Sequence, residues 1–196
     1  ALAGLNTTVC STSATNVVFA TTPTSVPAAS PNGYNITNIV IQAGLTQTAG
    51  NTGSPRNGVT SSEIQGDKFT NSTNGTLTVT YTVAPVSTGG CVGPTGNIVV
   101  TVEPTIKATV VPASLTQSIC SNTQTNIALS SPTIPSTGAA SISFSYTATS
   151  SLGGSISGFI PAVSNLPPGT ITDNLVNTAN NAGTVTYAIT AVSNGA

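Results

Sequence analysis

An alternation of apolar and hydroxyl side chains is clearest between Thr76 and Cys91, which reads TLTVTYTVAPVSTGGC. In its first half, Val79, Tyr81 and Val83 alternate with threonines. Because successive side chains of a strand point to opposite faces, this pattern predicts a strand with one apolar face and one hydroxyl face. The predicted hydroxyl face consists of Thr76, Thr78, Thr80 and Thr82.

The same alternation returns near the end of the chain, where residues 184–196 read TVTYAITAVSNGA. A second pair of similar stretches lies earlier in the sequence. Residues 9–19 read VCSTSATNVVF, and residues 119–129 read ICSNTQTNIAL. Similarity at a constant spacing is the signature of a repeated structural unit. The sequence therefore predicts two copies of one unit, over residues 1–106 and 107–196.

The remaining pattern is one of short strands and turns. Clusters of Gly, Pro and Asn separate the apolar runs, and residues 172–182 could form at most one turn of helix. This is typical of an all-β chain built from two tandem immunoglobulin-like β-sandwich repeats. We expect residues 76–85 and 97–102 to form a hairpin. Strands are also expected at 7–10, 16–20, 34–42 and 141–149, and residues 44–58 are expected to form a loop.

The second copy has no counterpart of residues 96–105, so the sequence predicts that it lacks its last strand. The residue that would match Cys91 falls just after Ala196. We therefore expect the chain to be part of a longer array of repeats.

Composition narrows the classes of function. Charged residues make up 4% of the chain, and the net charge is −1. The cations Arg56, Lys68 and Lys107 are far apart, whereas binding to nucleic acid requires clustered cations. No apolar run reaches the length of a membrane span, so no membrane insertion is expected. The first residues do not resemble a signal peptide, as is also true of a processed secreted chain or of an excised fragment.

The positions of the three cysteines can be compared between the two copies. Cys10 and Cys120 occupy the same position in the two copies, and Cys91 lies at the end of the first. We predict a Cys10–Cys91 disulfide, with Cys120 left unpaired by the truncation of copy two. A disulfide would indicate an oxidising, extracellular setting. The alternative is three free, buried thiols.

Together these stretches resemble the PKD-like repeats of very large Bacteroidetes surface proteins, including gliding-motility adhesins exported by type IX secretion. The resemblance rests on five motifs: VCS at 9–11, NSTNGTLTVTYTV at 71–83, VVTVEP at 99–104, ICS at 119–121 and NTANNAGTVTYAI at 177–189. It implies immunoglobulin-like stalk modules at the cell surface. The chain departs from related repeats in having no Trp and in the missing final Cys and strand of copy two.

The sequence offers few residues for a catalytic site or a metal-binding site. The chain contains no His to act as a general base, and copy two has no acid where Glu63 would align. Each copy keeps one aligned acid, Asp67 or Asp173, whereas Ca²⁺ requires six to eight oxygen ligands. We therefore expect no enzyme and no cofactor, and we interpret the aligned acid as a turn-capping residue.

Three functional hypotheses remain. The first is a structural stalk or adhesive module, whose partners are the neighbouring repeats of the same chain. The second is a subunit of an extracellular filament in which another copy completes the sheet by β-strand addition. The third is a module that binds carbohydrate, such as a surface polysaccharide, or another surface. The threonine row is either a flat binding surface or a set of good strand formers facing solvent.

Overall fold

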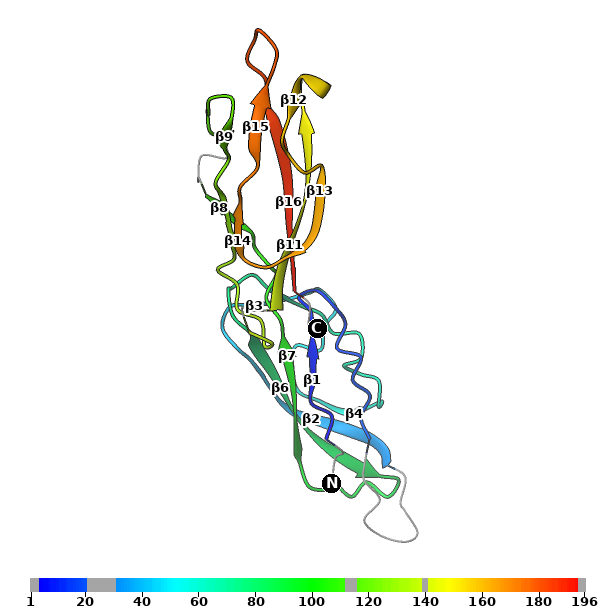
Figure 1. Cartoon of the computed structure of the whole chain (residues 1–196). Helices are drawn as coiled ribbons and strands as arrows, with labels where there is room; N and C mark the ends of the chain where they lie inside the picture. The colour runs from blue at the N-terminus through cyan, green and yellow to red at the C-terminus, as the bar shows by residue number, and fades with distance from the viewer. Residues whose placement is uncertain (1–3, 21–30, 112–115, 139–140, 194–196) are drawn as a thin grey trace. The chain divides into compact units, whose positions relative to one another are not determined.

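The computed structural model describes residues 4–20, 31–111, 116–138 and 141–193. Its contacts divide the chain between Thr105 and Ile106 into two compact units, called unit 1 and unit 2 below. Each unit is built from β-strands joined by turns (Figure 1), which confirms the predicted all-β fold of tandem immunoglobulin-like sandwiches. In the part of the chain described, no helix has the length and apolar character needed to cross a membrane.

Unit 1 is organised by a five-stranded sheet with the order β1-β7-β6-β2-β4. The long strand β6 pairs antiparallel with both β2 and β7, and this confirms the predicted hairpin. The short first strand β1 pairs with β7 in the parallel direction. The bounds are β1 Thr7–Val9, β2 Pro31–Ile41, β4 Arg56–Val59, β6 Leu77–Ser87 and β7 Gly96–Val102.

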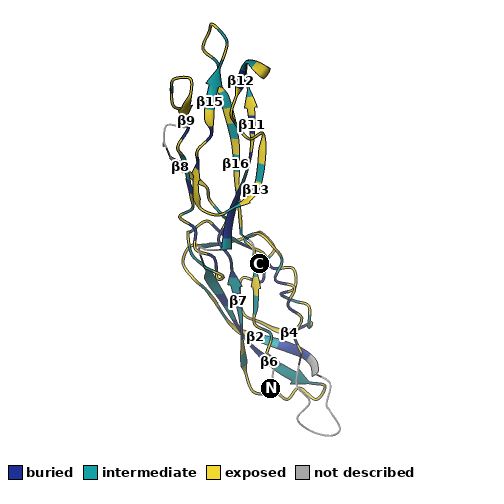
Figure 2. Cartoon of the chain, in the orientation of Figure 1, coloured by how far each residue is buried: buried dark blue, intermediate teal, exposed yellow. Residues whose placement is uncertain are grey.

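The core of unit 1 lies against one face of this sheet. Val79, Tyr81 and Val83 of β6 have no exposed surface, as the alternation predicts. Figure 2 colours the chain by the burial of each described residue. They pack in one cluster with buried residues that include Ile64 and Phe69. Phe69 begins β5 (Phe69–Asn71), which pairs with β3 (Leu45–Gln47) in a separate two-stranded sheet. The predicted loop over 44–58 therefore contains β3 and the first three residues of β4.

Residues 16–20 do not form the predicted strand. The backbone of Asn16 has a positive φ of 55°, which breaks the extended conformation. Backbone N–H groups of Asn16 and Phe19 donate to carbonyls of residues 61–65, which form turns, so no regular ladder develops. Val17 and Phe19 are nevertheless buried in the core. The alternation thus identifies the buried side chains correctly but not the secondary structure.

Unit 2 contains three small sheets, with the orders β13-β11-β16, β14-β10-β8 and β12-β15-β9. The predicted strand over 141–149 is present as β11. Residues 172–182 contain strand β15 instead of a helical turn, because Asn174 and Leu175 pair with β9. The bounds are β8 Thr109–Val111, β9 Thr123–Gln124, β10 Ile127–Ser130, β11 Ile142–Ser150, the 3₁₀ helix η2 Gly153–Ser155, β12 Ile156–Ser157, β13 Ala162–Leu166, β14 Gly169–Ile171, β15 Asn174–Asn177 and β16 Val185–Ser193.

The pair β11–β16 of unit 2 corresponds to the pair β2–β6 of unit 1. Among the described residues, β16 pairs with β11 alone, and nothing occupies the position of β7. The described residues of the second repeat therefore hold no counterpart of β7, in agreement with the sequence. Residues 117–119, which match β1, form no strand. The physical reason is direct, since β7 is the strand with which β1 pairs.

Candidate functional site

A buried carboxylate bonded to the central tyrosine occurs in both units. The Tyr81 hydroxyl donates to Asp67 Oδ2 at 2.7 Å, and the Tyr187 hydroxyl donates to Asp173 Oδ2 at the same distance. Asp67 is 3% exposed and also accepts a hydrogen bond from the Thr52 N–H at 2.9 Å. Burial raises the pKa of Asp67 above its ordinary value. Burial, and then the hydrogen bond to Asp67, raise the pKa of Tyr81.

This geometry fits a structural crosslink better than a reactive centre. Both carboxylate oxygens of Asp67 already accept hydrogen bonds from the protein. The raised pKa of Tyr81 keeps its phenol neutral, whereas a general base or nucleophile requires easier deprotonation. Within the described ranges, no group of three or more His, Cys, Asp or Glu residues is placed to hold a metal ion.

Asn71 joins three separate parts of unit 1. Its Nδ2 donates to the carbonyls of Gly75 and Val102, both at 2.9 Å, and its Oδ1 accepts from the Thr73 N–H at 3.1 Å. The backbone N–H of Asn71 donates to Ser11 Oγ at 2.9 Å. The side chain of Asn71 therefore fixes the turn before β6 and the end of β7, and its backbone N–H fixes the segment after β1.

Unit 2 repeats most of this arrangement around Asn177. The Asn177 N–H donates to Ser121 Oγ, its Nδ2 donates to the Asn181 carbonyl, and its Oδ1 accepts from the Ala179 N–H, each at 2.9 Å. Among the described residues, no contact of Asn177 corresponds to that of Asn71 with the Val102 carbonyl, and no strand corresponds to β7. We refer below to Asp67, Asn71, Tyr81 and their unit 2 counterparts Asp173, Asn177 and Tyr187 as the repeated polar residues.

Left-handed backbone conformations recur at matching positions of the two units. Asn16 and Asn126 have φ values of 55° and 49°, and Thr12 and Asn122 have values of 69° and 65°. Asparagine tolerates this region better than most residues with a side chain. The repeated Asn in the stretches 9–19 and 119–129 is therefore explained by backbone geometry, which the side-chain pattern alone does not indicate.

The three cysteines lie apart. Cys10 follows β1, next to the Val102 end of β7, whereas Cys91 lies in the connection that precedes the Gly96 end. At a rise of about 3.3 Å per residue, β7 alone separates these ends by roughly 20 Å. A disulfide requires Cα atoms within about 7 Å. The predicted Cys10–Cys91 bond is therefore not formed in this structure.

The alternative of buried thiols is not observed either, because Cys10, Cys91 and Cys120 are free and exposed. Within the repeated VCS and ICS stretches, the serine makes the structural contact. The hydroxyls of Ser11 and Ser121 accept the backbone N–H groups of Asn71 and Asn177. The repeat identifies cysteine positions that correspond, but not the end of the sandwich at which each lies.

The predicted hydroxyl face is half-buried rather than open. Thr76, Thr78, Thr80 and Thr82 all have intermediate exposure. The Thr78 hydroxyl donates to Gln42 Oε1 at 3.3 Å, and the Thr82 hydroxyl donates to Asn97 Oδ1 at 3.0 Å. Val40 of β2, 55% exposed, lies opposite Thr80. The outer face of the sheet therefore mixes hydroxyl, amide and apolar groups and is not a continuous threonine row.

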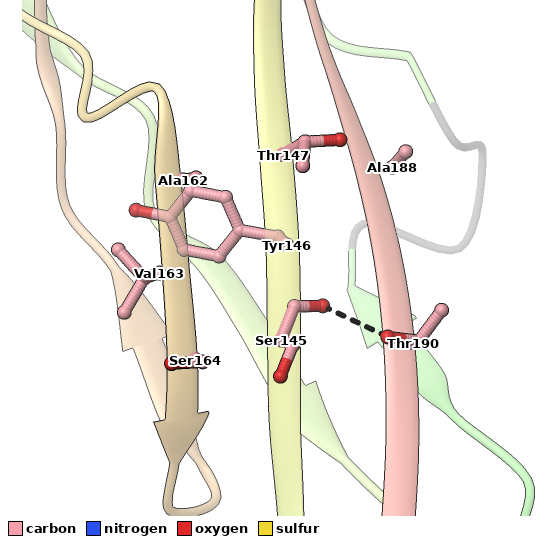
Figure 3. A pocket seen from close by; sticks show the side chains of 8 residues that line it. All are labelled: Ser145, Tyr146, Thr147, Ala162, Val163, Ser164, Ala188 and Thr190. Carbon is pink, nitrogen blue, oxygen red and sulfur yellow. Dashed lines mark hydrogen bonds between the residues drawn. The ribbon is translucent and has the colours of Figure 1, made fainter.

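A shallow depression of about 390 Å³ lies on the β13-β11-β16 sheet of unit 2 (Figure 3). The Thr190 hydroxyl at its edge donates to the Ser145 carbonyl at 3.4 Å. The lining side chains are mostly small and none is charged, so few groups converge to orient a ligand. They belong to Ser145, Tyr146, Thr147, Ala162, Val163, Ser164, Ala188 and Thr190.

Tandem β-sandwiches with internal polar crosslinks define a class of repeated structural modules. The PKD-like domain family matches residues 46–106 and again residues 117–196, and the chain belongs to this family. Domains of this family are typically structural or adhesive modules of extracellular and cell-surface proteins. No curated protein and no solved structure gives a significant match to the chain.

Proposed function

We propose that the chain is a load-bearing stalk module of a secreted bacterial cell-surface adhesin, of the kind that serves surface attachment or gliding motility. Three observations support this proposal. The chain contains two tandem copies of a PKD-like domain. Its motifs resemble those of gliding-motility adhesins. The repeated polar residues make hydrogen bonds between separate segments inside each unit.

The observation that carries the proposal is the pairing of the first and last strands of unit 1. Thr7, Thr8 and Val9 of β1 lie opposite Val100, Thr101 and Val102 of β7 in parallel register. Two further bonds extend this pairing. The Val99 N–H donates to Asn6 Oδ1, and the Glu103 N–H donates to the Val9 carbonyl, at 2.9 and 2.8 Å. We call this set of contacts the β1–β7 clamp.

The parallel direction decides how the clamp responds to tension along the chain. Force enters unit 1 at the start of β1 and leaves at the end of β7, and these points lie at opposite ends of the parallel pair. Pulling then slides the two strands past each other, so all hydrogen bonds of the clamp bear the load together. In an antiparallel hairpin pulled from its open end, the bonds would break one at a time. The clamp is therefore suited to a module that transmits force.

Single-molecule unfolding of the full chain, held at its two ends, tests this proposal. Because the carbonyl of Val9 accepts from Glu103, the backbone of Val9 faces β7, and that of Thr8 faces away. Val9→Pro removes an N–H that faces β7, whereas Thr8→Pro removes one on the opposite, unpaired edge. Val9→Pro should lower the unfolding force of unit 1 far more than Thr8→Pro. Equal effects of the two substitutions would count against load bearing by the clamp.

A further inference from the structure

A β-bulge distorts strand β13 of unit 2 beside the shallow depression described above. The pairing of β11 with β13 shifts by one residue between Phe144 and Tyr146, so Ser145 of β11 faces two residues of β13, Ser164 and Asn165. Asn165 has a positive φ of 57°. A bulge leaves its extra residue unpaired and redirects the side chains beside it. The depression therefore lies where the regular surface of the sheet is interrupted.

Free hydroxyl groups line the depression at this place. Ser145 and Thr147 of β11 and Ser164 of β13 alternate along their strands with side chains that enter the core. All three line the depression (Figure 3). Within the described ranges, none of their side-chain hydroxyls forms a hydrogen bond with the protein, because the Thr190 hydroxyl donates to the backbone carbonyl of Ser145. These three hydroxyls are therefore available to a ligand.

The depression carries no charged side chain. The sequence of unit 2 contains two charged residues, Lys107 and Asp173, and neither of them lines the depression. Asp173 is 8% exposed and accepts a hydrogen bond from Tyr187. A charged ligand would lose part of its hydration at this face without meeting an opposite charge, which is unfavourable. The face therefore favours an uncharged ligand.

Apolar groups lie between the free hydroxyls. Thr147 has Ala162 opposite it on β13 and Ala188 opposite it on β16, and all three residues are exposed. A hydroxyl can both donate and accept a hydrogen bond, so it can pair with the hydroxyls of a sugar. The alanines can contact the C–H groups of the same sugar. The mixture of groups thus matches a ligand that carries hydroxyl and C–H groups at short intervals.

The same pattern continues along the strands beyond the depression. Thr149 of β11 lies opposite Thr186 of β16, and both are exposed. Side chains on one face of a strand follow one another at about 6.7 Å, which is twice the rise per residue. Because few groups converge in the depression itself, a ligand gains more from weak contacts repeated along the strand. This arrangement favours an extended polymer over a single small molecule.

The matching face of unit 1 offers fewer free hydroxyls. The hydroxyls of Thr78 and Thr82 on β6 donate to Gln42 and Asn97. Between them, the hydroxyl of Thr80 forms no hydrogen bond with the described part of the chain, and the residue has intermediate exposure. Thr80 therefore provides a matched control, since it carries a free threonine hydroxyl on the outer face of the other unit.

We propose that the outer face of β13, β11 and β16 in unit 2 binds uncharged polysaccharide, with the hydroxyls of Ser145, Thr147 and Ser164 as its central contacts. The sugar chain lies along β11, from Ser145 toward Thr149. This inference rests on the proposed adhesin function, for which it names an adhesive surface and a chemical class of partner. It places adhesion in unit 2, whereas the β1–β7 clamp belongs to unit 1.

Amide chemical-shift titration of the full chain tests the proposal. The probes are uncharged oligosaccharides of dextran, mannan and xylan, and oligomers of alginate provide the charged comparison. At least one uncharged probe should shift the amide signals of Ser145, Thr147 and Ser164 in a saturable manner. Thr147→Val and Ser164→Ala should each weaken this binding by about two- to tenfold, because each removes one hydroxyl that bonds to the sugar. Thr80→Val should leave the Kd unchanged.

The absence of saturable shifts with all three uncharged probes would overturn the proposal, and so would equal binding of the alginate oligomers. An unchanged Kd in both Thr147→Val and Ser164→Ala would also overturn it. Shifts of the same amides on concentrating the chain alone would assign the face to a contact between copies instead. The titration and the force measurement concern different units, so a failure of either leaves the outcome of the other unaffected.

Discussion

Replacement of Asn71 by alanine should weaken unit 1 much more than the matching change at Asn177 weakens unit 2. Asn71 is completely buried, and its side chain makes four hydrogen bonds of 2.7 to 3.1 Å to Thr73, Gly75 and Val102. At about 0.5–1.5 kcal/mol net for each bond, with two sharing one acceptor, Asn71→Ala should cost about 2–4 kcal/mol. This is a large part of the roughly 5–15 kcal/mol that stabilises a typical domain.

The corresponding cost in unit 2 is smaller. The Asn177 side chain is half-buried and makes two hydrogen bonds, to Asn181 and Ala179. Asn177→Ala should therefore cost about 1–2 kcal/mol. Equilibrium unfolding in urea, followed by hydrogen-exchange mass spectrometry, assigns each loss of stability to its unit.

A surface change provides the control for this comparison. Asn38 is exposed on β2, and Asn38→Ala should alter stability by less than about 0.5 kcal/mol. The reasoning would be refuted if Asn71→Ala cost no more than Asn177→Ala, or no more than the control. Either result would mean that the amide contacts to the turn and to β7 do not hold the sandwich together.

Three further predictions follow from the buried tyrosine and the cysteines. Tyr81→Phe should destabilise unit 1 by about 1.5–3 kcal/mol, because it removes a hydrogen bond to the buried carboxylate of Asp67. Urea unfolding measures this loss of stability, and a loss below about 0.5 kcal/mol would contradict the prediction. Unit 1 should lose stability as the pH rises above 10.0, because Tyr81 ionises there in the unfolded chain while the raised pKa keeps the folded phenol protonated. The urea midpoint measures this dependence, and Tyr81→Phe should make it weaker. An equal loss of stability at alkaline pH in the variant would mean that Tyr81 is not its cause. Cys10 and Cys91 should both react with a thiol reagent in the native chain, and a cross-linked peptide containing both in a non-reducing digest would be the opposite result.

The alternation of side chains was sufficient to predict the central hairpin and its buried face. A strand buried on one face requires apolar residues at every second position, so Val79, Tyr81 and Val83 identify both the strand and its orientation. Alignment of the two copies then extends this interpretation to Tyr187, and it shows that copy two has no counterpart of residues 96–105 in the given sequence. These features depend on local periodicity and on comparison within the chain, which the sequence provides directly.

Features that depend on distant partners could not be obtained in this way. Residues 16–20 alternate like a strand, yet they face turns and form no ladder. The ends of β7 separate Cys10 from Cys91, and only the parallel pairing of β1 with β7 reveals this. The contact of Asn71 with Val102 joins residues 31 positions apart, so the repeated asparagine was visible in the sequence while its role was not.

The most direct test of the central claim is the force at which each unit of the full chain unfolds. Unit 1 has the complete β1–β7 clamp, and the described part of unit 2 lacks both of its strands. Pulling the chain from its ends should therefore give two unfolding steps, a weak one from unit 2 and a stronger one from unit 1. Val9→Pro, which assigns the steps, should lower the stronger one alone. Two steps of equal force, both insensitive to Val9→Pro, would contradict the account.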